Sequence, residues 1–598
     1  MAILDQSDRP NFLRASVLLI GLAWTLPFLQ PWHRFPLTSF YSEWLAFALG
    51  LAAALPLLRQ EPWRDARVPM IALAPLGLAV VLAVQVALDR VPYAEQALTA
   101  GLYLLWAALM AVLGHALGRR LTLDSIARTL AWFLLAGGLL NALIGLVQHY
   151  HVSTPFNFMV ARKLIPMISG NLGQFNHYAA YVTLALASVV YLYCRGYLQG
   201  ALATVCAALF LVVLALAGSR SPWLYIGMLI VLALLLHRLQ RDDASRRLAV
   251  FACWLLPGLI AAHWLVTLPF MVPDEGPLMM TSGERLFQVA SGVGRRLQLW
   301  GEAWQMFLGA PVFGAGYGQF AWHHFLYEAS SGASAGPWVY SHAHNIVLQL
   351  MAETGIAGAL VIVGAALAWL AGLRRVTFDP AWWWLLSLLA VIGIHSLLEF
   401  PLWYAYFLGP AALLLGLGAQ RPLAVRFPGA ARAVVGLGII AGWLNLIGVL
   451  SPYREFERLV FSSEQRSPPA AEEQDFARAL ANAHREPLLV PYVELAVVYG
   501  IAPSKEKLTE KLELTTRAMH FAPVDVVVYR QAVLLALAGS GEAARAQLER
   551  SLRVYPGERA VVIAELENLV RRYPVELTPL LELATSNFAQ RRVSQEGK

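Results

Sequence analysis

Residues 127–149 read ARTLAWFLLAGGLLNALIGLVQH, a stretch with a single Lys, Arg, Asp or Glu residue, Arg128, near its beginning. This length and composition are typical of a helix that crosses a bilayer, because about 20 apolar residues span the hydrocarbon core. Similar apolar blocks recur along the chain, and short segments rich in arginine separate them. The sequence therefore predicts a polytopic membrane protein whose fold class is all-α, a bundle of transmembrane helices.

The composition excludes an ordinary soluble enzyme. Only 14% of the residues are charged and 58% are hydrophobic, whereas soluble domains carry about 25% charged residues. Blocks of roughly 15 to 25 apolar residues give about thirteen predicted spans. Their extents are 15–29, 43–58, 69–88, 99–117, 127–149, 174–194, 199–217, 221–236, 248–268, 345–372, 381–396, 402–419 and 431–450.

The arginines predict which loops face the cytoplasm, because cytoplasmic loops collect Lys and Arg. Alternate loops contain such residues, among them Arg59, Arg67, Arg119, Arg120, Arg195, Arg238, Arg241, Arg374, Arg375, Arg421 and Arg426. We therefore expect the intervening loops, the segment 269–344 and the chain after 450 to be periplasmic. The net charge of +7 reflects this topology and gives no reason to expect a nucleic-acid partner.

The chain changes character after residue 450, where charges occur throughout and apolar residues follow helical spacing. We expect a transmembrane domain, 1–450, which includes the periplasmic loop 269–344, and a periplasmic helical domain, 451–598. Pro487, Pro523 and Pro556 recur at close to the roughly 34-residue period of tetratricopeptide repeats. Such a domain either presents a groove to a partner or packs against the membrane part, and the sequence leaves both open.

Polar and ionisable side chains gather on the predicted periplasmic side. Such groups are costly at membrane depth, so their concentration on one face predicts a functional site. They include Gln174, Asn176, His177, Arg220, Arg295, Arg296, His342, His344, Asn345, His395, Glu399 and Tyr404. The three cysteines fall inside apolar blocks and predict no disulfide. No carboxylate pair stands near the histidines at metal-ligand spacing, so we expect neither a metal nor another cofactor.

Three motifs follow one another inside the predicted periplasmic loop and the helix after it. Residues 294–300 read GRRLQLW, residues 311–318 read PVFGAGYG, and residues 341–345 read SHAHN, ahead of Glu353 and Gly355. This order resembles the O-antigen ligase superfamily, whose pattern is an Arg close to a Trp, a Pro and Gly-x-Gly stretch, and a His-Asn before Glu-x-Gly.

Two further stretches narrow the resemblance. Residues 170–177, GNLGQFNH, and 395–404, HSLLEFPLWY, are similar to the bacterial protein O-oligosaccharyltransferases of the PglL type. Residues 40–44, FYSEW, and the large tail fit that subfamily as well, so the resemblance covers most of the chain. The sequence departs from the pattern at Phe175, where the subfamily more often has Pro after the Gln.

The resemblance implies a transferase of the bacterial inner membrane that moves a glycan from undecaprenyl pyrophosphate to Ser or Thr of a periplasmic protein. Arg220 and Arg296 match the two recurrent arginines of the superfamily, with Arg295 as a third candidate for binding the pyrophosphate. Arginine suits this task because its guanidinium stays protonated and forms paired hydrogen bonds to phosphate oxygens. His344 is the expected general base. It should begin the helix that follows, whose N-terminus would keep the ring neutral.

The remaining candidates are expected to position substrates: Gln174, Asn176, His177, His342, Asn345, Glu399 and Tyr404. The resemblance favours such roles for Gln174 and Tyr404. For Asn176 an interhelical hydrogen bond is an equal alternative, and Glu399 either orients a cation or a histidine or forms a buried pair with His395.

Other functions remain open at this point. A ligase that joins O-antigen to lipid A-core, or a glycan polymerase, would share the site and differ in the acceptor. A lipid or solute transporter would place ionisable residues near the bilayer midplane, and a scaffold would leave the Arg and His-Asn motifs unexplained. The expected partners are the lipid-linked donor, membrane lipids and an acceptor protein, pilin-like or other, which the C-terminal repeats would bind.

Overall fold

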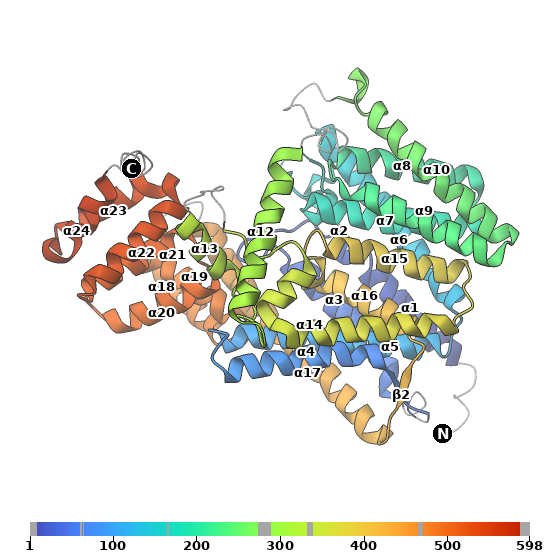
Figure 1. The fold of residues 1–598 in the computed structure, drawn as a ribbon, viewed down its shortest axis with the longest axis horizontal. Coiled ribbons are helices and arrows are strands. Elements are labelled where there is room, and N and C mark those ends of the chain that lie inside the picture. The colour runs from blue at the N-terminus through green and yellow to red at the C-terminus, as the bar shows by residue number, and fades with distance from the viewer. Residues whose placement is uncertain are drawn as a thin grey trace.

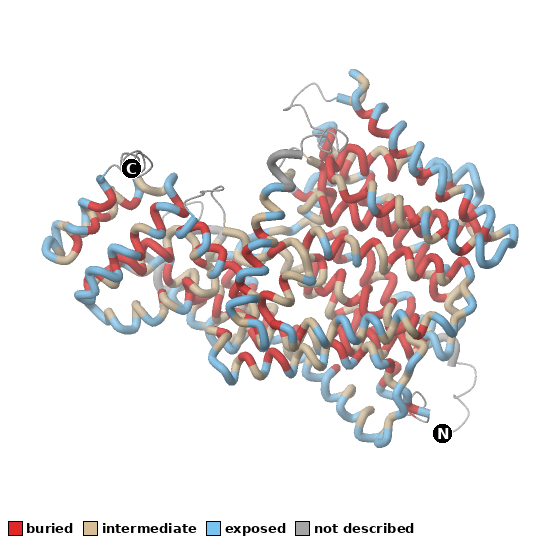
Figure 2. The backbone as a smooth tube through the Cα atoms, in the orientation of Figure 1, coloured by how far each residue is buried: buried red, intermediate tan, exposed pale blue. Residues whose placement is uncertain are grey.

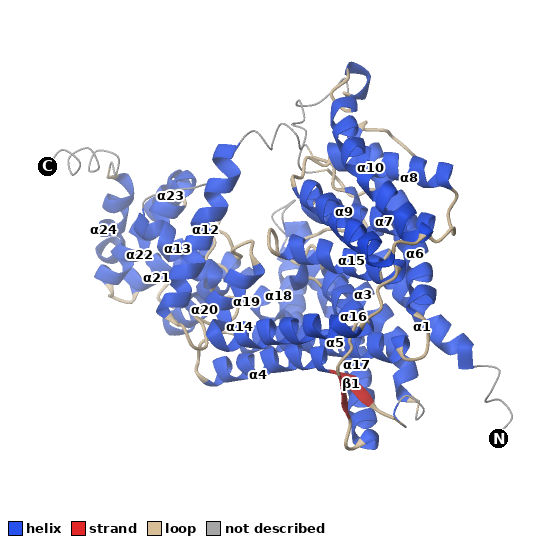
Figure 3. Ribbon diagram, turned by 45° about the vertical axis from the view of Figure 1, so that its right-hand side comes forward, coloured by secondary structure: helices blue, strands red, loops and turns tan. Residues whose placement is uncertain are grey.

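The computed structural model describes residues 9–59, 63, 65–163, 167–272, 289–331, 339–463 and 470–586. This part of the chain is almost wholly helical (Figures 1 and 3). Its one sheet is a short antiparallel pair, β1 (Arg67–Pro69) and β2 (Pro422–Ala424), with Val68 opposite Leu423. The predicted all-α class is confirmed.

The apolar helices form one bundle. They are α1 (Arg9–Ala23), α2 (Leu26–Leu29), α3 (Phe40–Ala54), α4 (Leu73–Ala87), α5 (Ala94–Gly118), α6 (Leu123–His149), α7 (Phe175–Cys194), α8 (Gly200–Leu216), α9 (Ser221–Gln240), α10 (Asp243–Leu265), α14 (Ile346–Gly372), α15 (Pro380–Ser396), α16 (Ala405–Leu417) and α17 (Pro428–Ser463). Between α10 and α14 lie α12 (Val289–Gly309) and α13 (Phe320–Ser331).

The tail consists of α18 (Ala470–His484), α19 (Val490–Gly500), α20 (Leu508–Phe521), α21 (Asp525–Leu537), α22 (Gly541–Val554), α23 (Arg559–Val570) and α24 (Pro574–Thr585). Single 3-10 turns join many of the helices. They are η1 (Leu55–Leu58), η3 (Met70–Ala72), η4 (Asn157–Met159), η5 (Gly170–Leu172), η6 (Pro269–Met271), η7 (Leu373–Arg375), η8 (Pro401–Trp403), η9 (Pro487–Leu489) and η10 (Pro556–Glu558).

Ten of the described helices are long and apolar enough to cross a membrane. They account for every predicted span except 199–217, 381–396 and 402–419, which form the shorter apolar helices α8, α15 and α16. The multi-pass membrane class is therefore confirmed, and the count of thirteen spans stays a prediction.

Contacts between loops test which loops lie on the same side of the bundle. At one end Arg119 pairs with Asp65 at 2.7 Å, and β1 pairs with β2. Elsewhere His33 Nε2 lies 2.7 Å from the carbonyl oxygen of Asn171. Each contact joins loops that the arginine distribution assigns to the same side. The alternation of the spans thus agrees with the prediction, while the periplasmic orientation remains to be tested.

Helix α6, which contains the stretch 127–149, approaches α7 closely at two adjacent glycines. A Cβ atom at Gly137 would lie 2.2 Å from the Tyr181 hydroxyl, and one at Gly138 would lie 2.3 Å from the Cβ of Ala185. Small residues permit such close contact between membrane helices. Helix α7 is accordingly buried along nearly its whole length, and buried residues fill the interior of the bundle (Figure 2).

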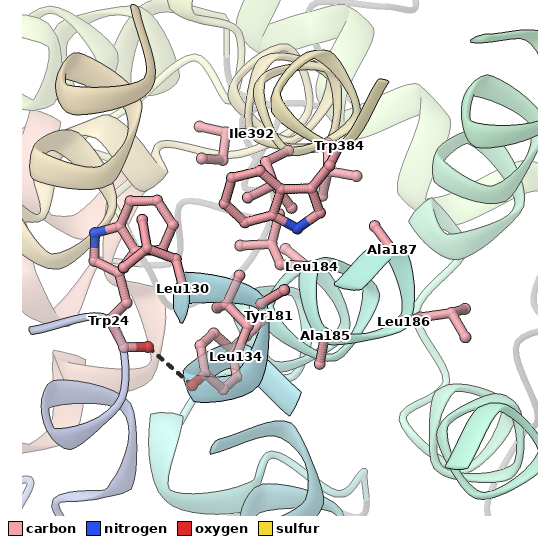
Figure 4. Packing of buried hydrophobic residues seen from close by; sticks show 14 of the residues in the cluster. Trp24, Leu130, Leu134, Tyr181, Leu184, Ala185, Leu186, Ala187, Trp384 and Ile392 are labelled. Carbon is pink, nitrogen blue, oxygen red and sulfur yellow. Dashed lines mark hydrogen bonds between the residues drawn. The ribbon is translucent and has the colours of Figure 1, made fainter. Parts of the chain in front are cut away.

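The centre of the bundle is closed by large aromatic side chains (Figure 4). Trp24 stacks on Trp384 with ring centroids 6.3 Å apart, and Tyr181 donates a hydrogen bond to the Trp24 carbonyl at 2.9 Å. The Trp384 indole N–H donates to Ser188 at 3.0 Å. These contacts satisfy polar groups that would be costly without partners in an apolar interior, so they help to fix the helices that carry the site.

The tail lies beyond one end of the apolar helices (Figure 1). Its helices pack on their sequence neighbours, α20 on α21, α21 on α22 and α23 on α24. The three prolines stand at or near helix starts, since Pro487 begins η9, Pro523 precedes α21 and Pro556 begins η10. This arrangement agrees with a helical tail, and the tetratricopeptide assignment stays a prediction.

Two helices connect the predicted domains 1–450 and 451–598, and the division between these domains stays a prediction. Helix α17 continues through it to Ser463, because a change from apolar to polar side chains does not interrupt backbone hydrogen bonding. Helix α13, inside the predicted loop 269–344, contributes Phe325 and Ala329 to the core of the tail. The parts of that loop at 273–288 and 332–338 lie outside the described residues.

Candidate active site

The glycine-rich segment 311–318 docks on a kink in α14. At the kink Gly355 has φ of 65°, and Ile356 donates its N–H to the first carbonyl of the segment at 2.8 Å. A Cβ atom at Gly314 would lie 2.2 Å from the carbonyl carbon of Glu353. Only glycine tolerates this backbone conformation and approach. These two motifs of the sequence therefore shape the loop between α12 and α13 and the helix that follows His344.

His344 lies two residues before the first residue of α14, close to the expected position. Its φ is 52°, an uncommon conformation for a residue other than glycine and one that often accompanies a functional constraint. Asn345 caps the helix, with its side-chain oxygen accepting from the N–H groups of Val347 at 3.0 Å and Leu348 at 3.2 Å. Asn345 thus fixes the backbone next to the histidine through its capping oxygen.

Glu399 contacts three of the other candidate residues at once. Its Oε2 accepts from His344 Nδ1 at 2.9 Å, and its Oε1 accepts from Arg296 Nη2 at 3.0 Å and Asn176 Nδ2 at 2.7 Å. Burial raises the pKa of this carboxyl, but the hydrogen bond and charge of His344 and the charge of Arg296 outweigh burial and leave the pKa below its usual range. The carboxylate therefore stays ionised near neutral pH.

The contact with Glu399 decides how the His344 ring can act. When Nδ1–H donates to the carboxylate, Nε2 carries the free lone pair. The ring thus contacts this carboxylate and also lies just before the beginning of α14, as the sequence predicts. Glu399 makes no side-chain pair with His395, whose Nδ1 lies 3.0 Å from the Tyr225 hydroxyl. A histidine oriented by a carboxylate is the arrangement of a general base.

Arg220 lies in the turn before α9, next to a residue that is hydrogen-bonded to this group. It is half-buried at the N-cap of that helix, and among the described residues its guanidinium has no hydrogen bond or ion pair. Its neighbour Ser219 donates to Asn176 Oδ1 at 2.8 Å, and Asn176 in turn donates to Glu399. Asn176 is therefore an interhelical link, one of the two alternatives that the sequence left open. The sequence analysis missed Ser219, although it stands beside Arg220.

Arg295, the third candidate for binding the donor, contacts a different set of side chains, and its role in donor binding stays a prediction. Its Nη1 lies 3.2 Å from Glu328 Oε1 and 3.1 Å from Gln298 Oε1, and its guanidinium lies over the ring of Tyr340. The side chain thus points between α12 and α13. Arg296, one residue further along α12, contacts Glu399 instead.

Gln174, His177 and Tyr404 lie beside the histidine and carboxylate. Gln174 caps α7, with its Oε1 accepting from the His177 N–H at 2.5 Å. The buried His177 ring lies 5.2 Å from the ring of Tyr404, and Tyr404 lies 6.0 Å from Phe400. Phe400, which the sequence analysis did not single out, lies 5.4 Å from His344. An aromatic chain therefore connects Tyr404 to the histidine.

His342 supports this aromatic chain. Its ring stacks on Phe400 with centroids 4.2 Å apart and meets Trp403 edge-on at 5.1 Å. Burial lowers the pKa of His342 to about 3, so the ring is neutral at physiological pH. This geometry suits a residue that orients Phe400. Contacts through Glu399 and Phe400 connect six of the predicted site residues in one group: Asn176, His177, Arg296, His342, His344 and Tyr404.

One group of described residues could hold a metal ion, and the sequence analysis missed it. The ligand atoms of Glu302, His324 and Glu328 all lie within 4.8 Å of one another, and all three residues are buried. Glu302 comes from α12 and the other two from α13, so their proximity depends on how these helices pack. The carboxylates already have partners, because Gln298 donates to both of them and Arg295 pairs with Glu328.

An apolar cavity of about 850 Å³ runs along α14. Its lining extends from Ile346 near the beginning of that helix to Leu370 near its end. Tyr404 and Glu43 are also among the lining residues. The cavity therefore contacts the aromatic chain of the site at Tyr404.

Two protein families match separate parts of the chain. Residues 205–363 match the family described as O-Antigen ligase, and residues 383–567 match the family described as Virulence factor membrane-bound polymerase, C-terminal. The first match contains Arg220, Arg296 and His344, and the second contains Glu399 and Tyr404.

Two curated relatives come from Acinetobacter baylyi. A General O-oligosaccharyltransferase is 29% identical over 421 residues, which cover 69% of this chain and 70% of the relative. A ComP-specific O-oligosaccharyltransferase is 24% identical over 293 residues, which cover 49% of this chain and 51% of the relative. The chain thus aligns with about half the length of the second protein.

Proposed function

Because this chain belongs to the O-antigen ligase superfamily and is similar to O-oligosaccharyltransferases, we propose that it glycosylates proteins on Ser or Thr. The glycan moves en bloc from an undecaprenyl-pyrophosphate carrier to the acceptor hydroxyl. One observation carries this proposal: Glu399 orients His344 and holds Arg296 at the same time. A base for the acceptor and a cation for the donor thus stand on either side of one carboxylate.

His344 acts on the acceptor. Its Nε2 takes the proton of the hydroxyl as the oxygen attacks the anomeric carbon, and a positioned base of this kind contributes roughly 10²–10⁴-fold to the rate. The imidazolium that forms is stabilised by the ionised Glu399, whose pKa lies below its usual range. Glu399 itself keeps no proton, so it orients the ring and balances its charge.

Arg220 and Arg296 act on the donor. As the new carbon–oxygen bond forms, the bond from the anomeric carbon to the phosphate oxygen breaks, and undecaprenyl pyrophosphate leaves with the electron pair. Arg296 uses one N–H for Glu399, and a guanidinium has five N–H donors, so others remain for phosphate oxygens. Fixed cations at a growing negative charge lower the barrier, which is why we propose a metal-independent reaction.

The cavity along α14 supports a lipid-linked donor. Binding in an apolar cavity would shield the isoprenoid chain of the donor from water and keep it away from the polar site. Tyr404 lines the cavity and contacts the ring of His177, so it stands where the lipid would meet the sugar-binding part of the site. Gln174 lies at the start of α7 beside it and is the candidate for sugar hydroxyls.

We place the protein in the bacterial inner membrane, with the site and the tail on the periplasmic side. The arginine distribution supports this orientation, and the tail is the candidate for binding the acceptor protein, pilin-like or other. Arg220, His344 and Glu399 lie at or just beyond the ends of apolar helices, which favours an enzyme over a transporter with ionisable groups at the midplane.

A ligase that acts on lipid A-core or a glycan polymerase is the second candidate, because the two matching families are described as a ligase and a polymerase. To distinguish the two, the purified protein is incubated with an undecaprenyl-pyrophosphate glycan as donor and either a pilin-like protein or core lipid as acceptor. The product is identified by mass spectrometry. We expect glycan on Ser or Thr of the protein. Product on core lipid alone would support the second candidate instead.

A further inference from the structure

A buried polar network between α12 and α13 is not used by the proposed reaction. His324 Nδ1 lies 2.5 Å from Glu302 Oε2, and Gln298 Nε2 donates to Glu302 at 2.9 Å and to Glu328 at 2.8 Å. Arg295 completes the network through its ion pair with Glu328 at 3.2 Å. The side chains of Glu302, His324 and Glu328 are 5%, 1% and 6% exposed. Such groups are costly to bury unless they hold one another.

Another face of α13 belongs to the tail. Phe325 and Ala329 lie in the hydrophobic core of the tail, and Arg553 Nη1 of α22 donates to the Ala329 carbonyl at 3.2 Å. Trp322 packs against His520 of α20 with ring centroids 4.6 Å apart. Figure 1 shows α13 among the tail helices, with α12 between the tail and the apolar bundle. Helix α13 therefore connects the tail to α12.

Helix α12 also carries the arginine of the proposed donor site. Arg295, Gln298 and Glu302 recur at i, i+3 and i+7, so they share the face of α12 that meets α13. Arg296 follows Arg295 and is turned by about 100° around the helix axis, which directs it to Glu399. Any rotation of α12 that released Glu302 from His324 would therefore also move Arg296.

We propose that this network, the α12–α13 clamp (Arg295, Gln298, Glu302, His324 and Glu328), holds Arg296 in the position in which it binds the donor. His324 is the central positioning residue. Because the tail holds α13 and the clamp joins α13 to α12, the tail is part of the donor site as well as a candidate surface for the acceptor. This inference rests on the proposed function for the identity of the donor.

The test measures binding of undecaprenyl pyrophosphate to the full-length protein in lipid nanodiscs. His324→Leu leaves the buried Glu302 carboxylate without this partner, so α12 should shift and donor affinity should fall about tenfold, with the KM for the acceptor unchanged. His324→Asn should restore most of the affinity, because its amide can donate to the same carboxylate. Glu576→Gln is the control, since it breaks an exposed ion pair with Lys505 elsewhere in the tail.

The outcomes separate the clamp from the proposed function. Absence of binding to the wild-type protein would contradict the proposed function. Equal binding by wild type and His324→Leu, or an equal loss in His324→Asn, would overturn the positioning role. If His324→Leu does not fold, Arg553→Ala on the tail side should weaken donor binding, and unchanged binding would remove the tail from the donor site. The metal content of the purified proteins is a further readout. Zinc or manganese bound stoichiometrically to the wild-type protein and absent from Glu302→Gln would show that the cluster is a metal site, and would overturn the clamp.

Discussion

Glu399→Gln should slow glycan transfer while it leaves the shape of the site nearly unchanged. At the 2.9 Å distance between His344 Nδ1 and Glu399 Oε2, an imidazolium and a carboxylate attract each other by about 6 kcal/mol at an effective dielectric constant of about 20. The amide keeps a hydrogen bond to the ring but loses the charge, and we take about 3 kcal/mol as the net loss. This corresponds to a decrease of about 10²-fold in turnover.

The assay is single-turnover transfer with the variant saturated with donor, so that weaker binding through Arg296 does not enter the rate. Glu576→Gln makes the same chemical change in an exposed pair of the tail and should transfer glycan at the wild-type rate. If Glu399→Gln also transferred glycan at the wild-type rate, the charge of Glu399 would not contribute to turnover, because a neutral partner would then serve His344 as well as the carboxylate does.

Four further predictions follow from the same geometry. His344→Ala should bind the lipid-linked donor nearly normally in a direct binding assay and lose roughly 10²–10⁴-fold in turnover; loss of donor binding would contradict its role as the base. Arg220→Ala and Arg296→Ala should each weaken donor binding and turnover together, and Lys should recover only part of both, because a point charge cannot replace the paired hydrogen bonds of the guanidinium. The folded-state pKa of Glu399 lies below its usual range, so its stabilising effect is present above the unfolded value of about 4.3 and disappears as the pH falls through the folded value; the difference in melting temperature between wild type and Glu399→Gln should be larger at about pH 5 than at about pH 3, and an equal difference at both values would argue against a depressed pKa. Gly355→Ala should lower the melting temperature by the equivalent of about 1–3 kcal/mol, since its φ of 65° and a carbonyl 2.4 Å from the new Cβ both oppose a side chain; an unchanged melting temperature would mean that the kink is not required.

Much of the fold follows from the sequence because a bilayer demands helices of a certain length and composition. The spans at 127–149 and 345–372 are visible in the sequence as long apolar runs, and the structure has α6 and α14 there. The boundary at 450 could not be located in the same way. Side-chain composition shows where the apolar span ends, whereas α17 continues as long as its backbone remains hydrogen-bonded.

Some residues of the candidate site can likewise be predicted from the sequence, whereas their contacts cannot. The motifs reveal His344 and Arg296 because these residue types in that order resemble a known family. They do not reveal which of two adjacent arginines faces the site, since Arg295 and Arg296 point in different directions only once α13 has packed on α12. The sequence also could not show which side chains Glu399 contacts. Its partners His344 and Asn176 lie 55 and 223 positions away in the chain, so they meet Glu399 only in the folded protein.

We propose that this site transfers a lipid-linked glycan to a protein hydroxyl with His344 as the base. The purified protein is incubated in EDTA with an undecaprenyl-pyrophosphate glycan and an acceptor protein. Released undecaprenyl pyrophosphate and glycosylated acceptor are then quantified by mass spectrometry. We expect one undecaprenyl pyrophosphate to be released for each glycan found on Ser or Thr, and both products to be lost in His344→Ala. Wild-type levels of glycosylated protein from His344→Ala would contradict the proposal.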